Sequence, residues 1–315
     1  MAFIALSACS TPTEEALPES SGPNSTGPNS SGPNSSGPIV ITNADVPFPT
    51  PASEPWLQSS AQRIVTLANG SGEVVVALGG ADRIVGRDET SNSPEIDQVP
   101  VVTKAHSVSA EQVIALNPDV VLIDAMTSPP EAIQQIRDSG ISVVEVPEAW
   151  SSAEVSTKIK AIGAAIGAPA GAIESAQGNS AGSLNENIAV GNRVAFLYLR
   201  GTSAIYLLGG IGSGADSLIK ESGAVDVGAE AGFDAFTPLT AEELVNLNPD
   251  TILVMADGLK SVGGVDGLFA LPGLAQTDAA QTRQVVVVDD TLLLSFGPRT
   301  GALIAALHSS WKQWG

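Results

Sequence analysis

Residues 108–126 read VSAEQVIALNPDVVLIDAM, and residues 239–257 read LTAEELVNLNPDTILVMAD, so one phrase occurs twice at an offset of 131 residues. In each copy a hydroxyl residue, Ser109 or Thr240, precedes a Gln or Glu by three places, which predicts a capping box at a helix start. An apolar helical stretch, an Asn-Pro-Asp stop and a run of aliphatic residues follow, and they indicate a buried strand. A helix-then-strand unit repeated at half-chain distance predicts two similar α/β lobes with a ligand cleft between them. Chance recurrence of a common phrase is the alternative.

Around the first copy, short strand-like segments alternate with helical ones. The strands are expected at 63–67, 83–86 and 141–146, and the helices at 70–78 and 131–139. This alternation is typical of a parallel, doubly wound sheet.

Residues 151–189 are rich in Ala and contain no strand candidate, so they predict helices, one of which joins the lobes. The helices are expected at 152–166 and 170–188, followed by strands at 193–199 and 204–208 and by a last helix at 300–314.

The N-terminus contains Leu6-Ser7-Ala8-Cys9, which has the form of a lipobox whose cysteine carries lipid. Cys9 is the only cysteine of the chain, so an internal disulfide or a cysteine metal cluster is excluded. Only five residues precede the lipobox, fewer than a signal peptide needs, and we interpret residues 1–8 as a signal-peptide remnant.

A turn-rich repeat, GPNST-GPNSS-GPNSS-GP at residues 22–38, offers no apolar side chain to bury, and we expect no folded structure before about Trp56. As a coil, such a tether would span on the order of 40 Å. The sequence has no run of 18 apolar residues, so it predicts no membrane-spanning segment. The expected division is a signal-peptide remnant (1–8), a lipidated disordered tether (9–58), an N-lobe (59–150), a helical linker (151–189) and a C-lobe (190–315).

The formal charge is −20, with only 14 Lys and Arg residues. A nucleic-acid groove needs a basic stripe, so we expect no nucleic-acid partner.

Taken together, the two lobes, the repeated S/T-x-E-x-[VL]-x-x-L-x-P-D phrase and the lipobox resemble the substrate-binding lipoproteins of ABC importers for siderophores, cobalamin and haem. The resemblance covers about residues 60–315. It implies an α/β fold of two doubly wound Rossmann-like lobes joined by a long linker helix, the architecture of a class III substrate-binding protein. Four segments look like the haem-binding branch of Gram-positive bacteria: VGRD (85–88), VTKAHS (102–107), FLYLRG (196–201) and FGPRT (296–300).

Ferric haem takes axial donors from His, Tyr, Met or Cys, and the sequence has two histidines. His106 precedes the cap residue Ser109 on a loop that is expected to border the cleft, so its imidazole could reach iron from the N-lobe. A solvated loop histidine is the alternative, and the family motif favours the ligand. His308, beside Leu307 and Trp311, is interpreted as a surface or packing residue.

Tyr198 and Arg200 are two residues apart at the end of a predicted strand, so their side chains share one face. A phenol binds iron(III) as phenolate only if that form is stabilised, and a neighbouring guanidinium stabilises it. The resemblance points to the same pair as ligand and supporting group. The alternative is a half-buried core tyrosine with a solvated arginine, which fits Tyr206, the reserve ligand, better.

The propionates of haem would need cations at the rim of the cleft, and we expect Arg299 in the FGPRT turn to supply one. Arg87 and Lys104 are further candidates, and each of the three could equally be a surface charge. Glu111 and Glu242 occupy matching places in the first turns of the repeated helices, where a carboxylate stabilises the helix dipole. The resemblance implies that these two acids dock into arginine pockets of a two-fold permease.

The leading hypothesis is a haem receptor that is lipid-anchored on the extracytoplasmic face of a Gram-positive cell membrane. It would carry haem b as transported ligand to an ABC permease and its ATPase, and upstream surface haem-binding proteins are candidate donors. The alternative is a cobalamin or iron-siderophore receptor of the same importer class. An enzyme is less favoured because the G-x-S-x-G, P-loop, G-x-G-x-x-G and HExxH motifs are missing from the sequence. A structural surface protein would leave the Tyr-x-Arg pair unexplained.

Overall fold

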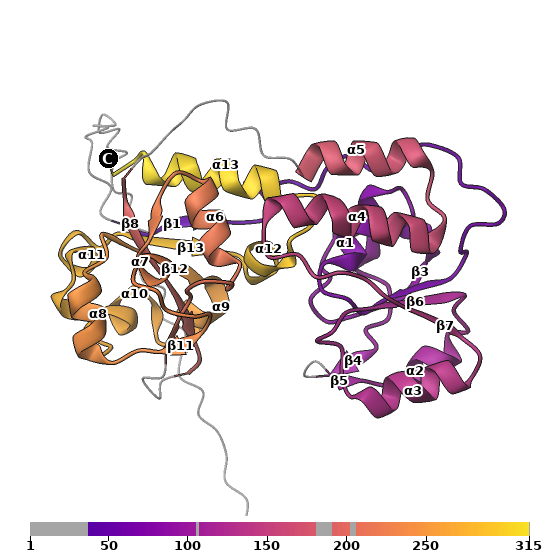
Figure 1. Cartoon of the computed structure of the whole chain (residues 1–315), viewed down its shortest axis with the longest axis horizontal. Helices are drawn as coiled ribbons and strands as arrows, with labels where there is room; N and C mark the ends of the chain where they lie inside the picture. Colours follow the sequence, from indigo (N-terminus) through magenta and orange to yellow (C-terminus); the bar gives the residue numbers. More distant parts are fainter. Residues whose placement is uncertain (1–36, 105–106, 181–190, 202–205, 315) are drawn as a thin grey trace, which may run out of the picture. The chain divides into compact units, whose positions relative to one another are not determined.

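The structure is a computed structural model that describes residues 37–104, 107–180, 191–201 and 206–314, and the side chain of Lys104 is left out. Residues 36–315 form one compact unit that contains a four-stranded parallel sheet and a separate mixed sheet, in which β9 pairs antiparallel with β8 and β11 (Figure 1).

The first sheet contains four parallel strands in the order β3-β2-β6-β7, so the chain crosses over after β3. The strands are β2 (Ile64–Thr66), β3 (Ile84–Arg87), β6 (Val120–Ile123) and β7 (Ser142–Glu145). The helices of this lobe are α1 (Ser71–Ala77), α2 (Ala110–Ala115), α3 (Pro130–Asp138), α4 (Ser152–Ile166) and α5 (Ala170–Ser180), with short 3-10 turns at Ala81–Arg83 and Pro94–Ile96. A two-stranded antiparallel ribbon, β4 (Thr103–Lys104) and β5 (Ser107–Val108), lies beside it.

Successive residues of β6 pack into different cores, which explains why the strand is apolar throughout. Val120 and Leu122 belong to the cluster formed with α1, α4 and α5, whereas Val121 and Ile123 belong to the cluster formed with α2 and α3. Helices therefore cover both faces of the sheet, as the doubly wound prediction requires.

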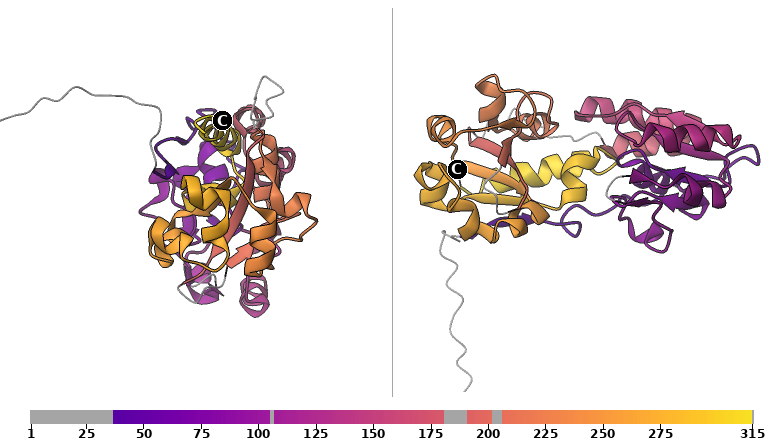
Figure 2. Two further views of the ribbon diagram at one scale, coloured as in Figure 1. Left: turned by 90° about the vertical axis from the view of Figure 1, so that its left-hand side faces the viewer. Right: turned by 90° about the horizontal axis from the view of Figure 1, so that it is seen from below.

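The second sheet has the order β1-β13-β12-β8-β9-β11, and β10 pairs with the early part of β8. Its strands are β1 (Ile39–Ile41), β8 (Arg193–Leu199), β9 (Tyr206–Leu208), β10 (Val225–Asp226), β11 (Thr237–Pro238), β12 (Thr251–Met255) and β13 (Val285–Val288). Its helices are α6 (Ala215–Glu221), α7 (Val227–Glu230), α8 (Ala241–Leu247), α9 (Ala256–Ser261), α10 (Gly264–Phe269), α11 (Asp278–Thr282), α12 (Asp290–Ser295) and α13 (Thr300–Trp311), with a 3-10 turn at Leu274–Gln276. Helices α6 and α13 cover one face of this sheet, and α8, α10 and α11 cover the other (Figure 2).

The two repeated phrases form equivalent units, α2 with β6 and α8 with β12, although only one has a complete capping box. The Thr240 hydroxyl accepts from the backbone N–H of Glu243 at 3.2 Å, and the Glu243 carboxylate accepts from the Thr240 N–H at 2.8 Å. The Ser109 hydroxyl accepts from Gln112 at 3.4 Å, but its own N–H donates to the carbonyl of Val102. The expected reciprocal bond from Gln112 is therefore wrong, because the carbonyl of Val102, just before β4, already satisfies that N–H.

The Asn-Pro-Asp stop performs the same two tasks in both copies. Asn117 and Asn248 adopt left-handed φ values of 46° and 40°, which end the helices. Asp119 and Asp250 then accept from the backbone N–H at the start of the neighbouring strand, at 2.9 Å and 3.0 Å. Each aspartate thus fixes the register of a central strand against its neighbour.

The predicted lack of folded structure before about Trp56 is wrong from Ile39 onward. Residues Ile39–Ile41 form β1 and pair in parallel with β13, with Ile41 buried and Val40 exposed on the edge. A strand of three residues next to a turn-rich repeat gives too short an alternation to be recognised in the sequence.

The helix predicted at 152–166 is α4, whose bounds are the same, and α5 begins at the predicted residue. The expected continuation of α5 to residue 188 lies outside the described residues, and the role of these helices as the link between lobes stays a prediction. In the described part of the chain we find no helix of the length and apolar character needed to cross a membrane.

Candidate ligand-binding cleft

A cavity of about 630 Å³ lies where the carboxyl ends of the parallel strands of the two sheets face each other. Loops that follow β2, β3, β6 and β7 form one side of it. The end of β8, the end of β12 and helix α12 form the other side. This volume is within the range of small-molecule sites, and both lobes contribute to the wall.

Apolar side chains cover much of the cavity wall and offer a surface for a flat, apolar ligand. They are Leu67, Ala68, Val108, Met126, Val146, Ala149, Trp150, Tyr198, Met255 and Leu294. Met126 is 75% exposed, so its side chain offers apolar surface to a ligand in the cavity.

Carboxylates are the second feature of the cavity wall. They are Glu73, Asp88, Glu89, Asp124, Glu148 and Asp290. Burial raises the pKa of Asp88, although hydroxyl donation from Ser91 and Thr90 opposes that shift. Burial likewise raises the pKa of Asp290.

Lys158 of α4 is the one basic side chain among the described residues that line the cavity. It is 3% exposed, and its ammonium donates to the carbonyls of Ser295 at 3.0 Å and Phe296 at 3.3 Å. Burial lowers the pKa of Lys158 to about 8, and the carboxylates of Asp124 and Glu73 oppose that shift. The sequence analysis missed this residue, although it shares a helix face with buried apolar residues of α4.

Tyr198 lines the cavity at the end of β8, and Arg200 contacts it as the two-residue spacing predicted. The guanidinium donates to the phenol oxygen from Nε at 3.0 Å and from Nη2 at 2.6 Å. Phe236 supports the phenol ring from the side, with ring centroids 5.6 Å apart in an edge arrangement. The phenol oxygen therefore accepts two N–H bonds from one guanidinium, which fixes its position at the cavity wall. Its role as an iron ligand stays a prediction.

His106 lies outside the described residues. Thr103 and Val108, which flank it in the β4–β5 ribbon, both line the cavity. Arg87 does not line the cavity, because its guanidinium donates to backbone carbonyls of the loop that follows β3, including Ser91 at 2.6 Å. The side chain of Lys104 is likewise not described.

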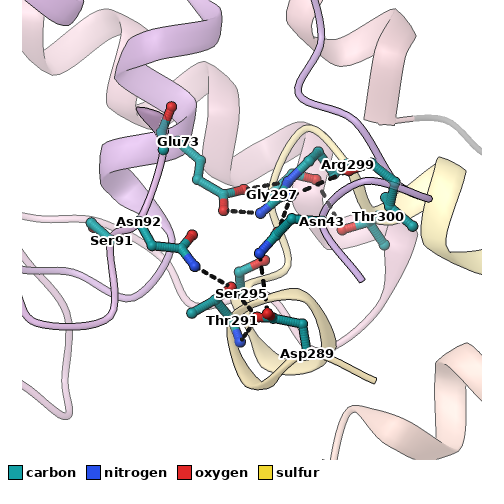
Figure 3. A network of polar contacts seen from close by, with 12 residues as sticks. Asn43, Glu73, Ser91, Asn92, Asp289, Thr291, Ser295, Gly297, Arg299 and Thr300 are labelled. Atoms are coloured by element: carbon teal, nitrogen blue, oxygen red, sulfur yellow. Dashed lines mark hydrogen bonds and ion pairs between the residues drawn. The ribbon is translucent and has the colours of Figure 1, made fainter. Parts of the chain in front are cut away.

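The expectation that Arg299 meets a ligand at the rim is wrong. Arg299 is 2% exposed and pairs with the buried carboxylate of Glu73 on α1, using both Nε and Nη2 (Figure 3). Its Nη1 donates to the side chain of Asn43 at 2.6 Å and to the carbonyl of Val46 at 3.2 Å. The guanidinium also stacks on Phe48 at 3.7 Å. Every face of the group is occupied by protein, so it is a junction residue and not a rim cation.

The two residues that were considered less favourable as ligands are both buried in the C-lobe. His308 is 5% exposed, and its Nδ1 lies 2.9 Å from the carbonyl oxygen of Ser222. Tyr206 is 4% exposed and donates its hydroxyl to the carbonyl of Pro272 at 2.7 Å. Burial raises the pKa of Tyr206, so the phenolate form is disfavoured there. Neither residue lines the cavity.

Glu111 and Glu242 are exposed in the first turns of α2 and α8, at matching positions of the repeat. Their predicted role in docking to a permease stays a prediction. Cys9 lies outside the described residues. Within those residues, His, Cys, Asp and Glu form no group of three or more arranged to hold a bare metal ion.

Residues 64–292 match the model of the periplasmic binding protein family. The chain belongs to that family. It is 29% identical over 255 residues to YvrC of Bacillus subtilis (strain 168), an uncharacterised ABC transporter substrate-binding lipoprotein, and the match covers 77% of each chain.

Solved structures of haem-binding proteins have the same fold as this binding protein. The periplasmic haem-binding protein RhuT from Roseiflexus sp. RS-1, in its apo form, has 34% identity and a TM-score of 0.74, covering 80% of this chain and 98% of RhuT. The haem-binding protein HmuT has 30% identity and a TM-score of 0.77, covering 88% of this chain and 98% of HmuT. HmuT has also been solved as variants in which a histidine, a tyrosine or an arginine is replaced by alanine, and that tyrosine and arginine are two residues apart.

Proposed function

We propose that this protein is a lipid-anchored receptor that binds ferric haem in the cleft and delivers it to an ABC permease. The observation that carries the proposal is the Tyr198 phenol, which lines the cavity with the Arg200 guanidinium donating twice to its oxygen. A phenolate that a guanidinium holds in place is an anionic oxygen donor, and such a donor is suited to iron(III).

The second axial donor in this proposal is His106, supplied by the N-lobe. The residues on either side of its loop line the cavity, and the wall between the two lobes is largely apolar. One donor from each lobe would therefore hold a planar porphyrin by both faces. The tyrosine, arginine and histidine variants of HmuT support the choice of these three residue types.

The orientation of the haem follows from charge. Six acidic side chains line the cavity against one lysine among the described residues. Arg299 neutralises one of them, Glu73, and the remaining excess of acid would repel the propionates from the interior. We expect the propionates at the mouth, near Arg200, whose side chain is exposed. Arg299 has no part in this orientation because Glu73 neutralises it.

The anchor and the docking acids complete the proposal. Lipid on Cys9 would attach the receptor to the extracytoplasmic face of the membrane, and the lipoprotein YvrC supports that placement. Glu111 and Glu242 would dock on the permease, because both are exposed at matching positions of the repeat.

An absorption titration of the purified full chain with ferric haem (hemin) tests the proposed ligand. We expect a Soret band with the wild type, and we expect Tyr198→Phe to shift the band and weaken binding about tenfold or more, since an iron–phenolate bond is lost. His106→Ala should also change the spectrum. Tyr206→Phe is the matched control, because that phenol is buried away from the cavity and its loss should leave the spectrum unchanged.

Two outcomes would overturn the proposal. The first is a wild-type protein that gives no Soret band while cyanocobalamin or a ferric hydroxamate siderophore binds, which would favour the alternative receptor class. The second is a Tyr198→Phe spectrum and affinity equal to those of Tyr206→Phe.

A further inference from the structure

The segment from Ile39 to Trp56, here named the strap, is bound to both lobes. Its first residues form β1 in the second sheet, where Ile39–Ile41 pair with Val286–Val288. Farther along, the N–H of Ala52 donates to the carbonyl of Ala77 at the end of α1, and Trp56 stacks with Arg83 of the first lobe at 4.5 Å. The family match begins only at residue 64, so the strap lies outside the part of the chain that the family model covers.

Between these two attachments, the strap inserts Asn43 into the buried polar junction of Figure 3. The Asn43 amide oxygen accepts from Arg299 at 2.6 Å, and its nitrogen donates to the carboxylate of Asp289 at 3.1 Å. Asp289 is the N-cap of α12 and accepts from the N–H of Thr291 at 3.0 Å. One side chain of the strap therefore holds both the start of α12 and the arginine that pairs with α1.

Helix α12 forms part of the cavity wall through Asp290, Thr291, Leu294 and Ser295. Its first turn is held by Asn43 of the strap, and its last residue is held by the Lys158 ammonium from α4. A six-residue helix has little stability of its own, so its position depends on such contacts. The strap thus acts on the cavity through α12 without touching a ligand.

We propose that Asn43 is a positioning residue for ligand binding: the strap fixes α12 in the wall of the cleft and slows ligand release. This inference rests on the proposed function only for its ligand measurement, because the position of α12 can be followed without any ligand.

Hydrogen–deuterium exchange on the full chain gives the ligand-free test. In Asn43→Ala, the amides of Leu292 and Leu293, which donate to the Asp289 carbonyl, should exchange about tenfold faster, as expected for loss of a hydrogen bond to a charged group. Amides of the central strand β12 should be unchanged. Val40→Ala is the matched control, because this side chain lies on the same strand of the strap, β1, and is 52% exposed.

A second variant separates positioning from general stability. Asn43→Asp keeps an oxygen acceptor for Arg299 but places a carboxylate against Asp289, so it should loosen α12 while retaining the attachment of the strap. Stopped-flow release of hemin to excess apomyoglobin should be several-fold faster in both Asn43 variants than in Val40→Ala.

The two measurements distinguish a failure of the proposed function from a failure of the strap proposal. A wild type that binds no hemin contradicts the proposed function, and the exchange of α12 then still decides the role of the strap. Exchange of Leu292 and Leu293 in Asn43→Ala equal to that in Val40→Ala overturns the strap proposal, as does hemin release that is unchanged in both variants.

Discussion

Asp226 is a buried carboxyl group at the start of α7, where its Oδ1 accepts from the N–H groups of Gly228 and Ala229. Burial raises the pKa of Asp226 to about 6, and the neighbouring carboxylate of Asp216 adds to that shift. The folded protein therefore holds this proton more tightly than the unfolded chain does. Its contribution to stability is fully present below about pH 4 and is lost as the pH rises through about 6.

Asp226→Asn should remove this dependence, because the amide keeps an acceptor for the helix N-terminus and cannot ionise. Above pH 7 we expect the variant to be more stable than the wild type by on the order of 2 kcal/mol, with the difference shrinking toward pH 4. Urea unfolding at a series of pH values measures it. A difference that is the same at every pH would contradict the assignment.

At the same scale, the sequence predicted contacts within a few residues of each other and missed those between distant segments. The Tyr198–Arg200 contact follows from strand alternation, so it could be predicted. The partner of Arg299 lies 226 residues away in α1, and no local pattern reveals it. In the sequence, the glycine-containing FGPRT turn near a predicted cleft is typical of an exposed rim. The fold instead buries the arginine of this turn.

At the scale of elements, the two copies of the helix-then-strand unit can be compared with each other, because one helix begins with a complete capping box and the other does not. The Thr240 hydroxyl and the Glu243 carboxylate bond reciprocally, whereas the Ser109 hydroxyl makes one long bond. Thr240→Ala should therefore destabilise the protein by about 1 kcal/mol, and Ser109→Ala by about half of that or less. Paired thermal and urea unfolding of the two variants tests the ranking, and equal losses would show that the reciprocal bond contributes nothing.

Long, strongly patterned elements were predicted nearly to the residue, as α4 and β8 illustrate. The duplicated central strands were also predicted, because burial on both faces makes them apolar throughout. The short strand β1 was missed, since its three residues belong to a sheet whose other strands begin 150 residues later. Which strand β1 pairs with depends on the topology of the sheet, and hydrophobic periodicity in the sequence carries no information about topology.

For the whole molecule, the two exposed glutamates of the repeat provide a test of transport that leaves the cleft untouched. Glu111→Lys and Glu242→Lys should each reduce haem uptake through the cognate permease several-fold. The double variant should abolish uptake, because a two-fold partner needs both contacts and reversed charges repel it. Hemin affinity should stay within about twofold of the wild type, since neither residue lines the cavity.

Glu131→Lys is the matched control, because this exposed glutamate also lies in the first turn of a helix, α3, outside the repeat. Uptake and hemin-dependent ATPase activity in reconstituted vesicles are the measurements. Full uptake by the double variant would contradict docking through these acids.

The pairing of β1 with β13 has a consequence for how the chain reaches its native state. Strand β1 must wait for a partner whose residues Val286–Val288 are synthesised 247 positions later. Until then β1 and the edge of β12 that pairs with β13 have no partner, and closing so long a loop is slow. The second sheet is therefore completed only when β13 has been made and pairs with β1. Fragments that stop before Val285 should expose a strand prone to association with other chains.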